Sequence, residues 1–368
     1  LRNRKRFSII LHGLGALCFA SLFFIPFLPI AGNYKKIILV AAIILAYICN
    51  YMVSNIIFHW GNTFVRPANR ATYGALKEMI SLITGAIVTF ASGIVVDHLM
   101  GIDNLEGAFV FLGISILVYS VVDLTLLLIM KKEFVQPTIA DNLDGTSPAK
   151  VEEKEKFTLI LKKLFKNKAF LAVTLLNTFR AMSVAITTHF LGTFKVNDLG
   201  MSATLISALT FLGMGVRAAV SIPFGKFTDK TSYVTGIIVG MFFNLFAFIS
   251  LIFCSNNTWY LMIIYVVLFD ISNAGVAMNF INITYNYVEK KYFAEAASLK
   301  NAMTGLGSFV GALIGAKILD AFGLEGINFL GFEHFYGQQA LSAISAGLIV
   351  FCILFAIFVI RPMKTTGK

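Results

Sequence analysis

The chain has 368 residues, of which 58% are hydrophobic and only 13% are charged. Soluble domains are about 45–50% apolar and about 25% charged. This composition excludes a soluble enzyme, a disordered chain and a nucleic-acid binder, although the net charge is +11. The four cysteines lie in or beside apolar stretches without a repeated spacing, so they predict neither a disulfide framework nor a metal site. We expect no cofactor.

Long apolar stretches alternate with short polar segments along the whole chain. A helix needs roughly 20 largely apolar residues to cross the hydrocarbon core of a bilayer. The sequence predicts ten such helices, and therefore an all-α membrane protein that crosses the bilayer many times. The predicted helices are 7–30, 37–58, 79–100, 108–130, 169–193, 203–224, 232–254, 260–281, 301–322 and 339–361.

The basic residues are divided unevenly between the two sides of the predicted membrane. If the N-terminus lies inside, most Lys and Arg fall on the inner side, and only Lys35, Lys36, Lys195 and Lys317 fall in or beside outer loops. Inner loops of membrane proteins carry an excess of positive charge. The sequence therefore predicts a protein of the plasma (inner) membrane with both ends of this chain in the cytoplasm.

A polar stretch separates the first four predicted helices from the last six. Its middle, from Asp141 to Lys156, has the composition of a flexible linker. From Phe157 to Phe165, apolar residues recur at helical spacing with lysines between them. This pattern predicts a basic amphipathic helix on the inner membrane surface, with a solvated linker helix as the alternative. The sequence therefore predicts three parts: the first four helices in residues 1–134, the cytoplasmic linker with its amphipathic helix in 135–168, and the last six helices in 169–368.

Two predicted helices share a residue pattern at one constant offset. They lie six spans apart, which is the period expected of two six-helix halves related by an axis along the membrane normal. Both helices are also rich in small residues, which let transmembrane helices approach closely. The matching residues are Ala71, Leu76, Lys77 and Asp97 in the first, and Ala294, Leu299, Lys300 and Asp320 in the second.

The segment between the sixth and seventh predicted helices resembles the cytoplasmic loop motif of the major facilitator superfamily. In that motif a Gly is followed four residues later by an Asp and then by a basic residue, as in Gly225, Asp229 and Lys230. The resemblance implies an alternating-access transporter fold of twelve helices. This chain would carry family helices 3 to 12, as a fragment truncated at its N-terminus. The Gly-Pro signature of the family's drug–proton antiporters is absent around Gly85 and Gly93.

Two ionisable residues lie near the middle of predicted spans, Arg180 and Asp270. A charge at the bilayer centre costs about 2.5–3.5 kcal/mol on insertion scales, so it persists where it faces a cavity or a partner. The resemblance makes their helices family helices 7 and 10, which line the central cavity. We expect Arg180 to bind an anionic group of the solute and Asp270 to take up a coupling proton. A structural ion pair between the two that touches no solute is the alternative.

Further polar side chains extend the expected site along three helices at helical spacing. Their hydroxyls and amides suit a polar solute, and the tyrosines add apolar faces. The candidates are Asn177, Ser183 and Thr187 beside Arg180, Asn273 beside Asp270, and Tyr47, Asn50, Tyr51 and Ser54 on family helix 4.

Taken together, the sequence predicts a monomeric secondary transporter that imports a small polar solute, anionic in one hypothesis, with a proton as the coupling ion of a symporter. An exporter of amphipathic compounds and a non-transporting sensor of the same fold are the alternatives. A channel is disfavoured by the two-half repeat. An enzyme is disfavoured because the chain has no H-E-x-x-H, P-loop or C-x-x-C motif. The expected partners are the solute and the bilayer, with no nucleic acid.

Overall fold

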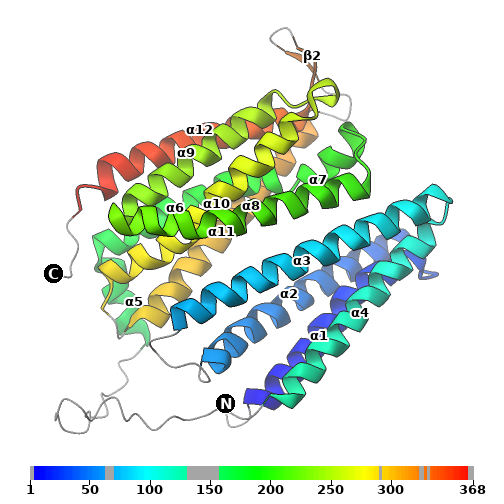
Figure 1. Ribbon diagram of the computed structural model, residues 1–368, viewed down its shortest axis with the longest axis horizontal. Helices are drawn as coiled ribbons and strands as arrows, with labels where there is room; N and C mark the ends of the chain where they lie inside the picture. Colours follow the sequence, from blue (N-terminus) through cyan, green and yellow to red (C-terminus); the bar gives the residue numbers. More distant parts are fainter. Residues whose placement is uncertain are drawn as a thin grey trace. The chain divides into compact units, whose positions relative to one another are not determined.

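The computed structural model describes residues 4–62, 70–130, 157–289, 292–322, 327–329 and 332–363 (Figure 1). Within these residues, ten helices are long and apolar enough to cross a membrane, which confirms the predicted all-α class and the number of spans. The predicted boundary at 134 and most of the predicted linker 135–168 lie outside the described residues. The chain forms two compact units, which are Leu1–Ser81 with Ala91–Val151, and Leu82–Phe90 with Glu152–Lys368.

The first unit is built from three whole long helices and most of a fourth, α3, whose residues 82–90 belong to the second unit. α1 packs against both α2 and α4. Gly15 brings α1 close to α2, since a Cβ at this position would lie 3.1 Å from the Cβ of Cys49. The elements in order are α1 (Arg4–Phe24), the 3-10 turn η1 (Ile25–Phe27), α2 (Gly32–Asn62), α3 (Arg70–Gly101) and α4 (Leu105–Ile129).

Polar contacts fasten α1 to α4 at two depths. His12 Nε2 lies 2.9 Å from Asp123 Oδ2. Lys5 Nζ donates to the carbonyl oxygens of Leu128 and Met130, each at 2.6 Å, which satisfies carbonyls left open at the C-terminal end of α4. Asp123 therefore has an interhelical packing role.

The second unit holds the remaining helices and one short β-hairpin. The hairpin is antiparallel and pairs Ile327 with Phe335 and Phe329 with Phe332. The elements are α5 (Phe157–Lys166), α6 (Lys168–Thr188), α7 (Leu191–Thr193), the π-helix η4 (Phe194–Asp198), α8 (Ala203–Lys230), α9 (Tyr233–Ile252), the 3-10 turn η5 (Asn256–Thr258), α10 (Leu261–Tyr287), α11 (Phe293–Phe322), β1 (Ile327–Phe329), β2 (Phe332–Phe335), α12 (Gly337–Phe355) and the π-helix η7 (Ala356–Ile360).

The core of the second unit lies among α6, α9, α10 and α12 (Figure 1). Large side chains from each of these helices are almost wholly buried there, including Leu176, Phe248, Met262 and Ile349. Burying side chains of this size contributes about 1.5–3 kcal/mol each in water. In a bilayer, where lipid is as apolar as leucine, close packing of these helices matters more than their removal from solvent.

Glycines on α11 confirm the predicted close helix approach. A Cβ at Gly311 would lie 2.5 Å from the carbonyl oxygen of Met182 on α6, and one at Gly307 would lie 2.7 Å from the Thr178 side chain. The backbones of α6 and α11 therefore pack nearly in contact, which only small residues permit. Gly305, by contrast, faces open space.

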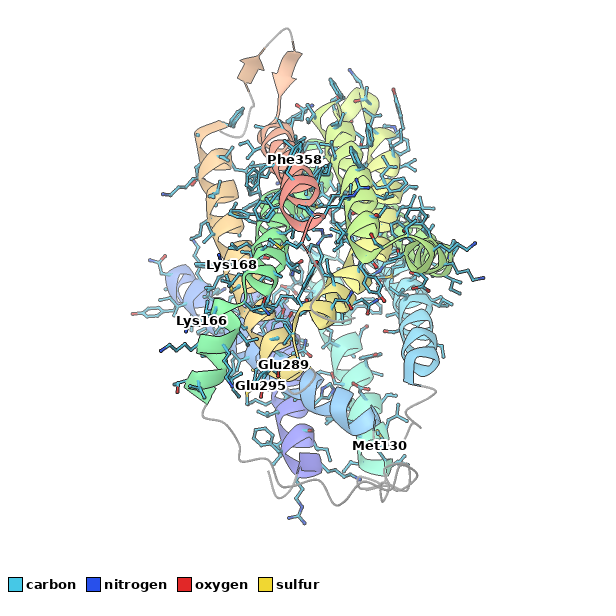
Figure 2. The ribbon with its side chains drawn as sticks, turned by 90° about the vertical axis from the view of Figure 1, so that its left-hand side faces the viewer. Met130, Lys166, Lys168, Glu289, Glu295 and Phe358 are labelled. Atoms are coloured by element: carbon cyan, nitrogen blue, oxygen red, sulfur yellow. The ribbon has the colours of Figure 1, made fainter. Side chains whose placement is uncertain are left out.

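The predicted amphipathic helix forms as α5, but part of its apolar face is covered by protein and not by lipid. Ile160 and Leu164 are buried in a small cluster with Phe170 and Tyr292. Lys163 Nζ also donates to the Tyr292 hydroxyl at 2.9 Å. Periodicity predicts that such a face is buried but does not tell protein from lipid as its cover. Figure 2 shows this end of the unit from the side, with Lys166, Lys168, Glu289 and Glu295 labelled.

The predicted cytoplasmic loop motif is helical, which corrects the expectation of a loop. Gly225, Asp229 and Lys230 belong to the last turns of α8, and only two residues separate α8 from α9. Thr228 within this segment is buried and accepts a hydrogen bond from Asn279 Nδ2 of α10 at 3.3 Å. This hydrogen bond joins the last turns of α8 to α10, and α8 extends through the whole motif to Lys230.

Candidate functional site

Arg180 lies midway along α6 and faces α10. Its Nη2 donates to Asn273 Oδ1 at 3.0 Å. Its Nε is buried and has no hydrogen-bond partner among the described residues. A buried donor without a partner is unusual, because its lost hydration costs about 1–3 kcal/mol. The guanidinium therefore keeps hydrogen-bonding capacity that the described part of the protein does not use.

Asp270 lies one turn before Asn273 on α10, but its carboxylate faces α8. A Cβ at Gly213 of α8 would overlap this carboxylate, so the lack of a side chain at Gly213 leaves room for the Asp270 carboxylate. The cations that act on Asp270 are Arg217 and Lys195. No ion pair joins Arg180 to Asp270 among the described residues, so the structure does not support the ion-pair alternative.

Lys195, the third member of this group, lies near the end of a span that is longer than the sequence predicts. It was expected beside an outer loop, because the predicted span ended at residue 193. In the structure the span runs from Lys168 to Asp198, and Lys195 lies in the π-helix η4. The apolar residues Phe194 and Val196 on either side were the signal that the helix continues. Lys195, Arg217 and Asp270 are called the charged cluster below.

The Asn177 side chain is hydrogen-bonded to α11, a helix on which no site residue was predicted. Its Nδ2 donates to Thr304 Oγ1 of α11 at 2.8 Å. Thr304 Oγ1 in turn donates to the Lys300 carbonyl oxygen at 2.7 Å. This chain of bonds ties α6 to α11 one turn from Arg180. Thr304 thereby joins the candidate site, although nothing in its sequence context had singled it out.

Ser183 and Thr187 face α12 and are fully buried. Ser183 Oγ donates to the Ser345 carbonyl oxygen at 2.8 Å, and Thr187 Oγ1 lies 2.7 Å from Ser345 Oγ. Ser345 Oγ also donates to the Ser183 carbonyl oxygen at 2.7 Å. These reciprocal bonds join two helices, and this geometry favours a packing role for both residues.

The predicted site residues of the first unit lie on α2. Tyr47 and Tyr51 are 49% and 67% exposed, and their rings stack with centroids 6.1 Å apart. Asn50, between them, is also exposed. The side chain of Ser54 lies outside the described residues. The polar face predicted for this helix is therefore present and accessible at three of its four positions.

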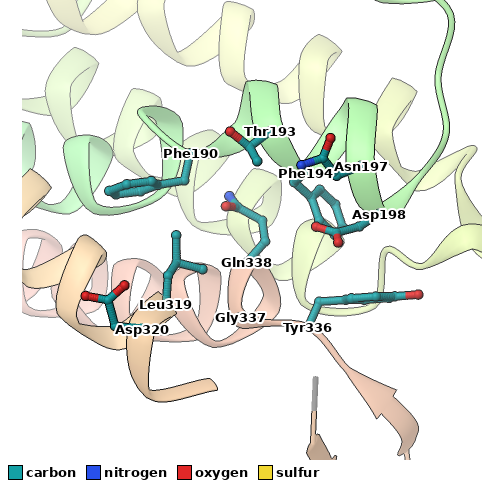
Figure 3. A pocket seen from close by; sticks show the side chains of 10 residues that line it. All are labelled: Phe190, Thr193, Phe194, Asn197, Asp198, Leu319, Asp320, Tyr336, Gly337 and Gln338. Carbon is teal, nitrogen blue, oxygen red and sulfur yellow. The ribbon is translucent and has the colours of Figure 1, made fainter. Parts of the chain in front are cut away.

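A cavity of about 370 Å³ lies at the end of the second unit where α6 continues into η4 and where α12 begins. Figure 3 shows its lining side chains, with Gln338 in the middle and Asp198 and Asp320 to either side of it. Arg180 and Asp270 are not among the lining residues. In the described part of the chain, no cluster of three His, Cys, Asp or Glu side chains could hold a metal ion.

Comparisons with known proteins give the family and the fold. The sequence profile of the Major Facilitator Superfamily matches residues 2–288 and 181–368. A mutant of the nucleoside transporter NupG is 15% identical with a TM-score of 0.65, over 96% of this chain and 83% of that one. A bacterial homologue of the iron transporter ferroportin, in its inward-facing state, is 14% identical with a TM-score of 0.62, over 96% and 81%. No curated protein matches the sequence.

These findings agree with the arrangement of helices described above. The two solved structures are too distant in sequence to carry a function over, but both share the fold across almost all of this chain. The family match spans nearly every residue, including both halves of the candidate site. The chain belongs to the major facilitator superfamily of membrane transporters.

Proposed function

We propose that this chain is a secondary active transporter that carries a small polar solute with an anionic group across the plasma membrane by alternating access. The observation that carries the proposal is the Arg180 guanidinium, whose Nε is buried without a partner and whose Nη2 is held by Asn273. A planar guanidinium suits the paired oxygens of a carboxylate or phosphate. Solute oxygens would satisfy the donor that the protein leaves open.

We further propose that Asp270 is the coupling group of a proton symporter. With Lys195 and Arg217 charged, the charged cluster has a net charge of about +1 when Asp270 is ionised and about +2 when it is protonated. An anion bound nearby at Arg180 favours the more positive state, so solute binding promotes proton uptake. By linkage, proton uptake strengthens solute binding equally.

We infer the orientation of the chain from its basic residues. The excess of Lys and Arg on one side of the membrane supports the placement of both ends of this chain in the cytoplasm. With that orientation, α6 begins at the inner face and η4 lies at the outer face. Arg180 and Asp270 then lie between the two faces, where alternating access would open them to one side at a time.

Uptake into proteoliposomes tests the anion-binding role. One fold neighbour is a nucleoside transporter, so the panel of radiolabelled solutes starts with uridine and uridine monophosphate and continues with glucose and glucose 6-phosphate. We expect saturable uptake of one or more anionic members. Arg180→Lys should lower that uptake about tenfold or more, since a hydrogen bond to a charged group contributes about 1.5–3 kcal/mol. Lys36→Gln, an exposed lysine of the first unit, is the control and should have no effect.

The coupling role is tested by the pH dependence of the same uptake. Wild-type uptake of the anionic solute should rise as the outer pH falls, and Asp270→Asn should make it independent of pH because the amide cannot take up a proton. The same pH response in Asp270→Asn as in the wild type would remove the proton role from this residue.

A further inference from the structure

The cavity between η4 and α12, called the end pocket below, has two carboxylates in its wall. Asp198 is the last residue of η4, and Asp320 lies in the last turn of α11. Among the described residues neither carboxylate lies within ion-pair distance of a cation. An anion near a helix C-terminus is unfavourable, because the carbonyl ends of the helix carry partial negative charge. Both carboxylates would therefore be stabilised by a cation in the pocket.

Gln338 supplies an independent sign of a ligand. This side chain is only 2% exposed, and its Nε2 donates to the Thr187 carbonyl oxygen at 3.0 Å. Its Oε1 has no hydrogen-bond partner among the described residues. In Figure 3 the amide lies at the centre of the lining side chains. A buried acceptor that faces a cavity is satisfied when a donor enters it.

Aromatic rings complete the wall of the end pocket. Phe190, Phe194 and Tyr336 line it, and the rings of Phe194 and Tyr336 meet edge to face with centroids 5.8 Å apart. Aromatic rings attract cations through their negative faces. The N-terminal end of α12 contributes about half a positive charge, which is smaller than the two negative charges opposite it. The pocket is thus acidic on balance, with apolar walls.

The size of the pocket and the identity of its donors select the ligand class. A volume of about 370 Å³ lies within the range of sites for small organic molecules. Among the described residues no cluster of three His, Cys, Asp or Glu side chains forms here. An ammonium group with an apolar substituent fits the carboxylates, the amide and the aromatic rings together. The N–H groups of the ammonium would donate to Asp198, Asp320 and Gln338, and its apolar substituent would pack against the aromatic rings.

We propose that the end pocket binds a small organic cation, a protonated amine that carries an apolar or aromatic substituent. The pocket is formed entirely by the second unit and does not include the residues of the proposed transport site. The proposal therefore stands apart from the transport function.

Calorimetric titration of the purified full chain in nanodiscs tests this proposal with three matched probes. Benzylammonium carries the cation, benzyl alcohol is its neutral counterpart, and benzoate reverses the charge. We expect benzylammonium to bind at least tenfold more tightly than the other two. Combining Asp198→Asn with Asp320→Asn should weaken its binding about tenfold or more. Asp103→Asn is the matched control, because it makes the same change at an exposed carboxylate of the first unit.

Several results would overturn the proposal. Equal binding of benzoate, or no binding of benzylammonium at millimolar concentration, would show that the pocket does not select cations. Binding that is lost in Asp270→Asn but kept in the double variant would place the cation in the transport site. Thermal unfolding of each variant checks folding, and Asp320→Asn alone, at an exposed position, tests the pocket if the double variant unfolds.

Discussion

At the scale of single residues, the two membrane-embedded charges have different surroundings. Arg180 is hydrogen-bonded to Asn273, whereas Asp270 lies against Gly213 and is acted on by the charges of Arg217 and Lys195. The sequence placed Arg180 and Asp270 at similar depths, because depth follows from position along a helix. It did not give their partners, since these depend on how each helix is rotated against its neighbours. The partners of a buried charge can be identified only from the three-dimensional structure.

A glycine beside Asp270 offers a test with a built-in control. Gly213→Ala places a methyl group where the carboxylate lies, and the carboxylate can rotate away at little cost because it ends a flexible side chain. We expect uptake of the anionic solute to fall about tenfold with the unfolding temperature nearly unchanged, since the charged cluster is disturbed but the helices are not. Gly215→Ala, which faces open space, should behave as wild type. Equal uptake by the two variants would argue against a role for Asp270.

At the scale of elements, hydropathy and periodicity predicted which segments are helical but not all of their ends. The ten spans and α5 are present where expected. The helix that begins at Lys168 continues to Asp198, and α8 continues through the whole predicted loop motif. Polar residues such as Lys195 and Asp229 suggested ends at these points. Both helices extend past these points. Thr228 bonds to α10 within the extension of α8, and apolar residues flank Lys195 in the other extension.

The contact between α6 and α11 predicts opposite effects at two glycines of one helix. Gly311→Ala forces a methyl group against the backbone of Met182, and overpacking of this kind costs about 1–3 kcal/mol. We expect its thermal unfolding temperature in detergent to fall by several degrees. Gly305→Ala should not lower it, because the site is open and Ala favours a helix by about 1 kcal/mol. Similar destabilisation by both changes would show that α11 does not pack on α6 through Gly311.

The docking of α5 is tested by removing its buried contact. Leu164 is 3% exposed and Leu159 is 48% exposed on the same helix. Truncating a buried leucine costs about 2–5 kcal/mol. Leu164→Ala should therefore raise the hydrogen–deuterium exchange rate of the α5 amides at least tenfold, while Leu159→Ala should leave it nearly unchanged. Faster exchange in the Leu159 variant instead would mean that lipid, and not α6 and α11, covers the helix.

At the scale of the whole molecule, the composition and the apolar stretches predicted an all-α membrane protein with ten spans. The internal repeat and the loop motif predicted a transporter and its family. The family match and the shared fold confirm both. The end pocket could not be predicted from the sequence. Its residues come from segments that are far apart in the chain, near Phe190, Leu319 and Gln338, and none of them forms a motif.

The central claim is that Arg180 anchors an anionic solute in a carrier, and counterflow tests it most directly. Proteoliposomes are loaded with unlabelled solute identified by the uptake panel, and labelled solute is added outside. A carrier exchanges solute through one site that opens to alternate sides, so we predict a transient accumulation of label that saturates. In Arg180→Lys this accumulation should fall about tenfold or more. Label that only equilibrates, or an accumulation that is unchanged in Arg180→Lys, would contradict the account.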